Sequence, residues 1–312
     1  MAAKNLPYAI AFLFVPAMWA SNIILVKDLS EDIPTFALVL ITYGLGALTV
    51  LAARPLLKAP KFTKREWMYG ALIGVMVFAA TGFQFLGLLY TTPANSGLFT
   101  ILYVIFIPVI VLIIKRRFSY RPLLFAVIGL IGVVVLSGAW EGVVSLNRGD
   151  AFTAIGAVFW ALQFVLLEKY SPGLNSVNLT VTYLVFVTLA AAATTLIAEN
   201  SAYGTMAPQS SWVASLVFMG VVTIGLCFLI QTFVQSKVPA STVAMLCCTQ
   251  SLFALLFSLI LGYDEVTLAL IGGAALITVS AALSALYGQE PLIGEEEADG
   301  RAADAQGDAR TV

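Results

Sequence analysis

Histidine is absent from the 312-residue sequence, cysteine occurs only three times, and charged residues make up 11% of the chain. The lack of histidine excludes Ser-His-Asp and Cys-His catalysis and every His-ligated metal site. The cysteines, Cys227, Cys247 and Cys248, lie in apolar runs and are too few to hold a zinc ion alone. We therefore expect no catalytic residues, no metal and no other cofactor.

The scarcity of charge also excludes a water-soluble protein. Soluble globular proteins carry about 25% charged residues. This chain has 60% hydrophobic residues and a mean hydropathy of +0.97, which leaves too little polar surface to keep it in water. The composition predicts an integral membrane protein embedded in a lipid bilayer, and the net charge of −1 gives no reason to expect a nucleic-acid partner.

Long charge-free runs divide the chain into spans, since about 20 consecutive apolar residues cross a bilayer as a helix. The runs are continuous, which favours helices over the alternating strands of a membrane barrel. The run from Trp67 to Ile114 is too long for one helix, and the turn-rich segment 91–96 divides it. The sequence therefore predicts an all-α integral membrane fold with ten transmembrane helices, at residues 8–26, 35–53, 68–89, 95–114, 122–139, 151–168, 178–198, 211–232, 240–261 and 267–287.

Basic residues predict the orientation of these spans, because cytoplasmic loops are enriched in Lys and Arg. With ten spans, both termini and every even-numbered loop lie on one side of the membrane. Of the 16 Lys and Arg residues, only Lys27 and Arg148 fall on the other side. The sequence therefore predicts a multi-pass protein of the cell membrane with both termini in the cytoplasm.

The two halves of the chain resemble each other. Trp19-Ala20-Ser21-Asn22 in the first span is matched by Trp160-Ala161-Leu162-Gln163 in the sixth, and Pro93-Ala94-Asn95-Ser96 is matched by Pro239-Ala240-Ser241-Thr242 at nearly the same spacing. Since five is odd, a second five-helix repeat enters the bilayer inverted, as in many secondary transporters whose site lies between the repeats. We expect two inverted five-helix repeats around a central cavity, the first at residues 1–140 and the second at residues 150–287. Residues 288–312 are expected to form an acidic, disordered cytoplasmic tail.

These features resemble the drug/metabolite transporter superfamily, and its EamA-type branch in particular. The resemblance rests on five plus five spans, cytoplasmic termini and the segment Pro93-Ala94-Asn95-Ser96-Gly97-Leu98…Pro108, and it covers residues 7–287. It implies a central cavity lined by spans 1–4 and 6–9, with spans 5 and 10 at the periphery. Members often carry a Gly-Glu pair just after spans 4 and 9. Here two residues separate Glu265 from Gly262, and the first half has Arg116-Arg117 instead.

Neutral polar side chains supply the candidate site, because the spans carry almost no charge at depth. Trp19 and Asn22 lie three residues apart and share a helix face, and Trp160 and Gln163 repeat the arrangement. An indole N–H beside an amide suits a zwitterionic or amphipathic metabolite. The alternative is that these groups only hydrogen-bond one helix to another. The candidate cavity residues are Trp19, Asn22, Gln84, Tyr103, Trp160, Gln163, Gln231 and Gln250.

Three further residues have two interpretations each. Pro16 and Pro108 lie inside spans 1 and 4, where a proline removes a backbone hydrogen bond and bends the helix. They are candidate hinges, and the alternative is a static bend. Glu168 closes the sixth span, and we expect it to be an interfacial partner of Lys169. A proton-coupling carboxylate is the alternative.

The sequence predicts a secondary transporter or facilitator for a small-molecule substrate that works by alternating access. Amino acids or similar zwitterionic solutes fit best, and the expectation of export comes from the family resemblance alone. No phosphate-binding loop is present, so the chain is not expected to drive transport with ATP. The alternatives are a transporter of sugar conjugates or cationic drugs and a non-transporting scaffold or sensor. An enzyme is disfavoured, and a homodimer is left open.

Overall fold

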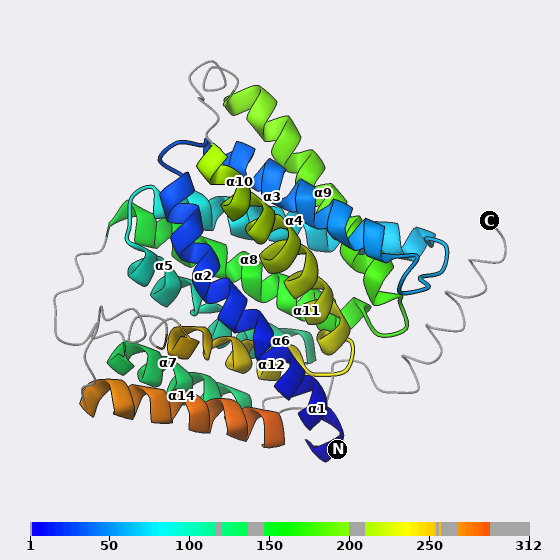
Figure 1. Cartoon of the computed structure of the whole chain (residues 1–312). Helices are drawn as coiled ribbons and strands as arrows, with labels where there is room; N and C mark the ends of the chain where they lie inside the picture. Colours follow the sequence, from blue (N-terminus) through cyan, green and yellow to red (C-terminus); the bar gives the residue numbers. More distant parts are fainter. Residues whose placement is uncertain are drawn as a thin grey trace.

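The computed structural model describes residues 2–115, 120–136, 147–199, 210–253, 256 and 268–287. All of its labelled elements within these residues are helices, as the sequence predicts (Figure 1). The motif residues Arg116, Arg117, Gly262 and Glu265 and the predicted acidic tail at 288–312 lie outside the described residues.

The helices divide between the two halves of the chain. Those of the first half are α1 (Ala2–Phe12), α2 (Phe14–Leu29), α3 (Thr35–Ala53), α4 (Lys64–Leu88), α5 (Pro93–Thr100), α6 (Tyr103–Lys115) and α7 (Tyr120–Leu136). Those of the second half are α8 (Arg148–Tyr170), α9 (Ser176–Ala198), α10 (Ser210–Val217), the π-helix η2 (Phe218–Leu226), α11 (Cys227–Gln235), α12 (Ala240–Cys247) and α14 (Leu268–Tyr287).

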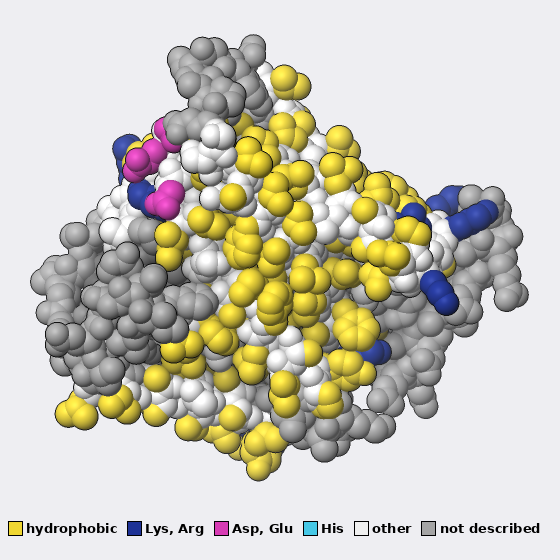
Figure 2. All heavy atoms as spheres, viewed as in Figure 1, with side chains coloured by type: hydrophobic (Ala, Val, Ile, Leu, Met, Phe, Trp, Pro, Cys, Tyr) yellow, Lys and Arg dark blue, Asp and Glu magenta, His cyan; other side chains and the backbone are white. Residues whose placement is uncertain are grey.

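Seven helical segments in the described part of the chain are long and apolar enough to cross a membrane, judged by length and composition. They coincide with the predicted first to fourth and sixth to eighth spans. Shorter apolar helices lie at the predicted fifth, ninth and tenth spans, at Tyr120–Val135, Ala240–Phe253 and Ile271–Ser284. Figure 2 shows hydrophobic side chains across the middle of one face and charged side chains at its edges, as expected for a protein surrounded by lipid.

Two capping boxes explain where α4 and α8 begin. Thr63 accepts a hydrogen bond from the backbone N–H of Glu66, whose carboxylate accepts from the N–H of Thr63. Asn147 and Asp150 make the same reciprocal pair at the start of α8. Each pair satisfies N–H groups that would otherwise lack partners, and each acid favours the positive end of its helix. Both carboxylates are buried, so the two long central helices begin at fixed points.

The helices pack in two clusters of buried apolar side chains. In one cluster, α3, α4, α9 and η2 pack against one another, and α4 lies along both α8 and α9. In the other, α6 and α12 pack against α8, and α7, which is paired along α14, packs on α6 and α12 (Figure 1). Trp19 and Trp160 are partly buried side chains that pack against both clusters. The two indoles that the sequence singled out therefore lie where the clusters meet.

Candidate functional site

A single phenylalanine joins the two indoles. The Phe228 ring lies 5.6 Å from the Trp19 ring and 6.2 Å from the Trp160 ring, measured between centroids. Tyr43 and Tyr183 each approach the same ring at 5.9 Å. These distances lie in the range of favourable aromatic pairs. The Trp residues of both halves thus contribute to one aromatic cluster.

Trp19 and Asn22 bind the π-helix η2. The indole N–H of Trp19 donates to the carbonyl of Thr223 at 3.0 Å, and the hydroxyl of Thr223 donates to Asn22 Oδ1 at 2.9 Å. A π-helical segment within an otherwise α-helical span is frequent at functional sites. Both predicted residues of α2 therefore face the same point on the eighth span, as their shared helix face implies.

Trp160 faces a chain of polar groups in the first half. Its indole N–H donates to Gln84 Oε1 at 3.1 Å, and Gln84 Nε2 donates to the hydroxyl of Thr100 at 3.1 Å. This chain joins α8 to α4 and to the end of α5. The predicted residues Trp160 and Gln84 are thereby brought into direct contact.

The amides of Gln163 and Gln231 face each other across α8 and α11. Their reciprocal N···O distances are 3.5 and 3.4 Å, and both side chains are fully buried. This pairing corresponds to the alternative considered from the sequence, in which the two amides hydrogen-bond one helix to another. Tyr103 is also buried, and its ring stacks on that of Phe164 with centroids 5.1 Å apart.

Two helices are interrupted at corresponding places in the two halves. Turn residues Ile101 and Leu102 separate α5 from α6, and turn residues Cys248 and Thr249 follow α12. Interrupted spans at matching positions of two repeats are a strong structural indication of a binding site, because their backbone groups and helix ends become available to a solute. Both interruptions lie within the predicted repeat, in spans 4 and 9.

Each interruption lies beside a tryptophan. Thr100, next to the first interruption, links through Gln84 to Trp160. Gln250, next to the second, donates from Nε2 to the carbonyl of Trp19 at 3.2 Å. Trp19, Asn22, Trp160 and Gln250 are partly exposed. These four side chains keep accessible surface, whereas the amide pair between α8 and α11 is buried.

The candidate hinges lie near interruptions and not at them. The turn residue Leu13 separates α1 from α2 three residues before Pro16, whose ring removes the bond to the carbonyl of Phe12. Pro108 lies inside α6, more than one turn beyond the interruption at Ile101. A hinge role stays a prediction for both residues.

Charged side chains gather at the two ends of the helices around the site. Lys27, at the end of α2, donates to the carbonyl of Leu88 at 2.7 Å, and Asp150 accepts from the hydroxyl of Thr91. We call this the Lys27 end. Asp150 and Glu168 are separated by about 27 Å of helix, at ~1.5 Å per residue, so Glu168 marks the opposite, Glu168 end.

Glu168 is buried at the end of α8, where its carboxylate binds a backbone group of another helix. Only 4% of it is exposed, and its Oε2 accepts from the backbone N–H of Ala240 at 2.8 Å. This contact joins the end of α8 to the first turn of α12. No spacing within the sixth span could have revealed it, because the partner lies in another span.

The sequence did not single out Phe228, Thr223 or Thr100. A phenylalanine within an apolar run has the same pattern whether it faces lipid or a partner helix. The hydroxyls offered a weak signal, since Thr223 lies between Gly220 and Gly225 in an apolar span. Such small residues allow close helix contact: a Cβ on Gly220 would lie 2.4 Å from Leu45 Cβ and 3.1 Å from the carbonyl oxygen of Thr42, both in α3.

Comparison with known proteins assigns the family. The profile of the EamA-like transporter family matches residues 6–138 and 147–286, once in each half. This protein belongs to the EamA-like transporter family. The resemblance predicted from the sequence is confirmed, and the function class is membrane transport.

Relatives of this EamA-like chain agree with that class. An uncharacterized transporter of Archaeoglobus fulgidus is 26% identical over 289 residues, covering 91% of this chain and 87% of the relative. An uncharacterized transporter in the sor 3′ region of Acidianus ambivalens is 31% identical over 130 residues, covering 38% and 48%. A solved crystal structure shares the fold with a TM-score of 0.74 at 20% identity, over 93% of this chain and 100% of that chain. Both of these relatives are named as transporters.

Proposed function

We propose that this protein is a secondary transporter or facilitator that exports amino acids or similar zwitterionic metabolites by alternating access between two inverted repeats. One observation carries the proposal. An interrupted helix from each half lies beside a tryptophan of the other half, and both indoles meet on Phe228. Movement of the two clusters relative to each other would change the access to this point from the two ends.

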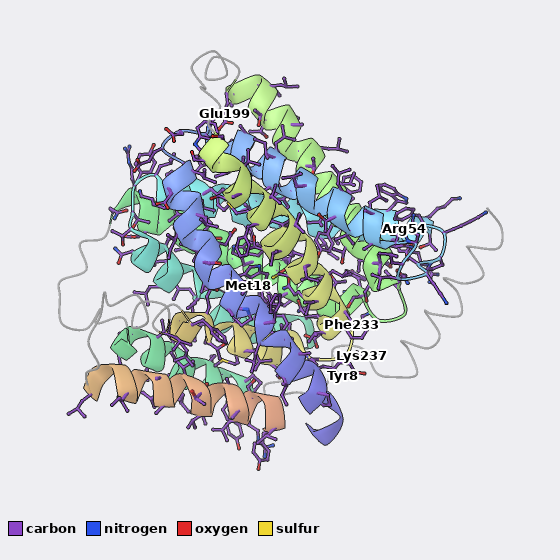
Figure 3. All side chains as sticks on the ribbon, viewed as in Figure 1. Tyr8, Met18, Arg54, Glu199, Phe233 and Lys237 are labelled. Carbon is purple, nitrogen blue, oxygen red and sulfur yellow. The ribbon has the colours of Figure 1, made fainter. Side chains whose placement is uncertain are left out.

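Contacts between α3 and α9 support the inverted arrangement. Arg54, just after α3, donates from Nε to Asn178 in the first turn of α9 at 3.0 Å. Glu199, just after α9, accepts from the N–H groups of Phe36 and Ala37 in the first turn of α3 at 2.9 and 3.0 Å. Figure 3 shows Arg54 and Glu199 at opposite ends of this helix pair. Such an exchange is what two inverted copies of one helix would make.

The chemistry of the site favours the substrate class. Its described polar groups are indoles, amides, hydroxyls and backbone atoms, and all of them are neutral. Interrupted helices offer N–H groups to a carboxylate and carbonyls to an ammonium group, and the aromatic cluster can hold an apolar side chain. The same cluster favours the second candidate substrate, a cationic drug, through cation–π attraction.

The orientation belongs to the same proposal. With both termini in the cytoplasm, the Glu168 end faces the cytoplasm and the Lys27 end faces the outside of the cell. Nearly all basic residues then lie on the cytoplasmic side, as the positive-inside rule requires.

A release assay tests the proposal. Purified protein is placed in liposomes loaded with amino acids, amines, sugars and nucleosides, and mass spectrometry identifies the solutes that leave, with and without an imposed proton gradient. Selective release of amino acids, lost in the Trp19→Ala/Asn22→Ala variant, is the expected result. Ile24→Ala on the exposed face of the same helix is the matched control. Absence of any protein-dependent release would contradict the proposal.

A further inference from the structure

Lys27 and Glu168 occupy equivalent places on the two tryptophan helices. Lys27 follows Trp19 by the same number of residues as Glu168 follows Trp160, and each lies in the last turns of its helix. One is a cation and the other an anion. Each contacts the segment that leads into the interrupted helix of its own half.

At its end of the molecule, Lys27 holds the turn between α4 and α5. Its Nζ donates to the carbonyl of Leu88 at 2.7 Å and to that of Thr91 at 3.4 Å. A cation is favourable here because the carbonyl of Leu88 lies at the negative, C-terminal end of α4. The turn leads directly into α5 and the interruption at Ile101, so the contact fixes the entry of the first interrupted span.

At the other end, Glu168 holds the start of α12. Its carboxylate accepts from the N–H of Ala240, which directly follows Pro239. An anion is favourable at this positive helix end. Gln235, at the end of α11, donates to the carbonyl of Phe164 at 3.0 Å and joins α11 to α8 one turn away from Glu168. The contact fixes the entry of the second interrupted span, which continues to Cys248.

We propose that Lys27 and Glu168 are positioning residues that decide which end of the transporter opens. Lys27 holds the Lys27 end closed, and Glu168 holds the Glu168 end closed. Each acts by tying a tryptophan helix to the entry of an interrupted helix, at opposite ends of the site. Each contact stabilises only the state in which its end is closed. Weakening one contact therefore shifts the population toward the state that is open at that end. This inference rests on the proposed transport function.

Labelling of a single cysteine reads the two states directly. Ile23 is half-buried on α2 beside Gly97 of α5, so Ile23→Cys reports access to the site from either end. The native cysteines are replaced by alanine, and a membrane-impermeant thiol reagent is applied to vesicles of each orientation. Exposed reporters, Asp28→Cys and Lys237→Cys, establish which end the reagent reaches.

The two charge substitutions should have opposite effects. Lys27→Met should raise labelling from the Lys27 end about tenfold relative to labelling from the Glu168 end, since a hydrogen bond to a charged group is lost only in the closed state. Glu168→Leu should change this ratio in the opposite direction. Glu168→Gln should shift it less, because its amide oxygen still accepts, and Lys27→Arg should leave it near the wild-type value. Asp28→Asn and Lys237→Gln are the matched controls, and both should leave it unchanged.

If Lys27 and Glu168 only stabilised the fold, the two substitutions would not shift the labelling ratio in opposite directions. If both substitutions shift the ratio in the same direction, or neither shifts it in folded, monodisperse protein, the inference is overturned. If Lys27→Met or Glu168→Leu does not fold, Lys27→Gln and Glu168→Gln decide the matter by whether their smaller shifts in this ratio have opposite directions. Labelling needs no substrate, so opposite shifts without any solute release would contradict the transport proposal and leave the positioning roles intact. Solute release without opposite shifts would support the transport proposal and contradict the positioning roles.

Discussion

At the Lys27 end, α8 begins against the last turn of α4. At the Glu168 end, in the equivalent position of the proposed repeat, α1 lies against α11. The first contact is made by backbone and buried polar groups: a Cβ on Gly149 would lie 2.5 Å from the carbonyl oxygen of Gly87 and 2.9 Å from the nitrogen of Thr91. Asp150, 1% exposed, accepts from the hydroxyl of Thr91.

The second contact is an aromatic one. The rings of Tyr8 and Phe233 meet edge to face with centroids 5.9 Å apart, and 47% of Phe233 is exposed (Figure 3). Aromatic pairs contribute about 0.5–1.5 kcal/mol beyond burial, whereas hydrogen bonds to charged groups contribute about 1.5–3 kcal/mol. The difference indicates that α1 separates from α11 more readily than α8 separates from α4. We therefore expect the Glu168 end to open with less cost than the Lys27 end.

The largest effect should come from Gly149→Val, which breaks the backbone approach at the Lys27 end. The new side chain would force α8 away from α4, and overpacking of this kind costs about 3 kcal/mol. The thermal unfolding midpoint in detergent should fall accordingly. Gly272→Val is the matched control, because no atom lies within 4 Å of a Cβ there. Equal midpoints for the two variants would contradict the close approach.

A smaller loss is expected for Asp150→Asn at the same end. The substitution keeps the shape of the side chain and removes the carboxylate that accepts from the Thr91 hydroxyl and the Asn147 N–H, at a cost of about 2 kcal/mol. Thermal unfolding measures this cost, with Asp28→Asn, an exposed acid at the end of α2, as the control. A loss no greater than the control's would show that the buried carboxylate does not hold this end together.

The smallest effect belongs to the Glu168 end. Phe233→Leu removes the ring contact with Tyr8 and should destabilise the protein by about 1 kcal/mol or less. Combined with Tyr8→Leu in a double-mutant cycle, it should give a non-additive loss, because the two rings share one contact. A loss larger than that of Asp150→Asn would reverse the ranking of the two ends.

The sequence predicted the helices well, because the signal is local. Charge-free runs located every span for which the structure describes a long helix, and the Trp19 and Trp160 motifs pointed to the junction of the two clusters. The start of α4 was also readable, since Thr63-Lys64-Arg65-Glu66 has the spacing of a capping box. The seventh span begins at the Asn175 cap for the same kind of local reason.

The interior contacts were not predictable, because they are non-local. Nothing near Gln163 shows that its partner is Gln231, and nothing near Glu168 shows that it binds the N–H of Ala240. The interruption at Ile101 and the π-helix around Thr223 lie in uniformly apolar sequence, where neither proline nor charge marks them. Such features depend on which neighbouring helices supply partners for the freed backbone groups.

A paired rate measurement tests most directly whether the two halves jointly build one site. Initial rates of solute release from liposomes are compared for the wild type, Trp19→Ala and Trp160→Ala, each confirmed as folded and monodisperse. We expect each substitution alone to lower the rate about tenfold or more, because each indole borders the same bound solute. A normal rate in either variant would contradict a site shared by the two halves.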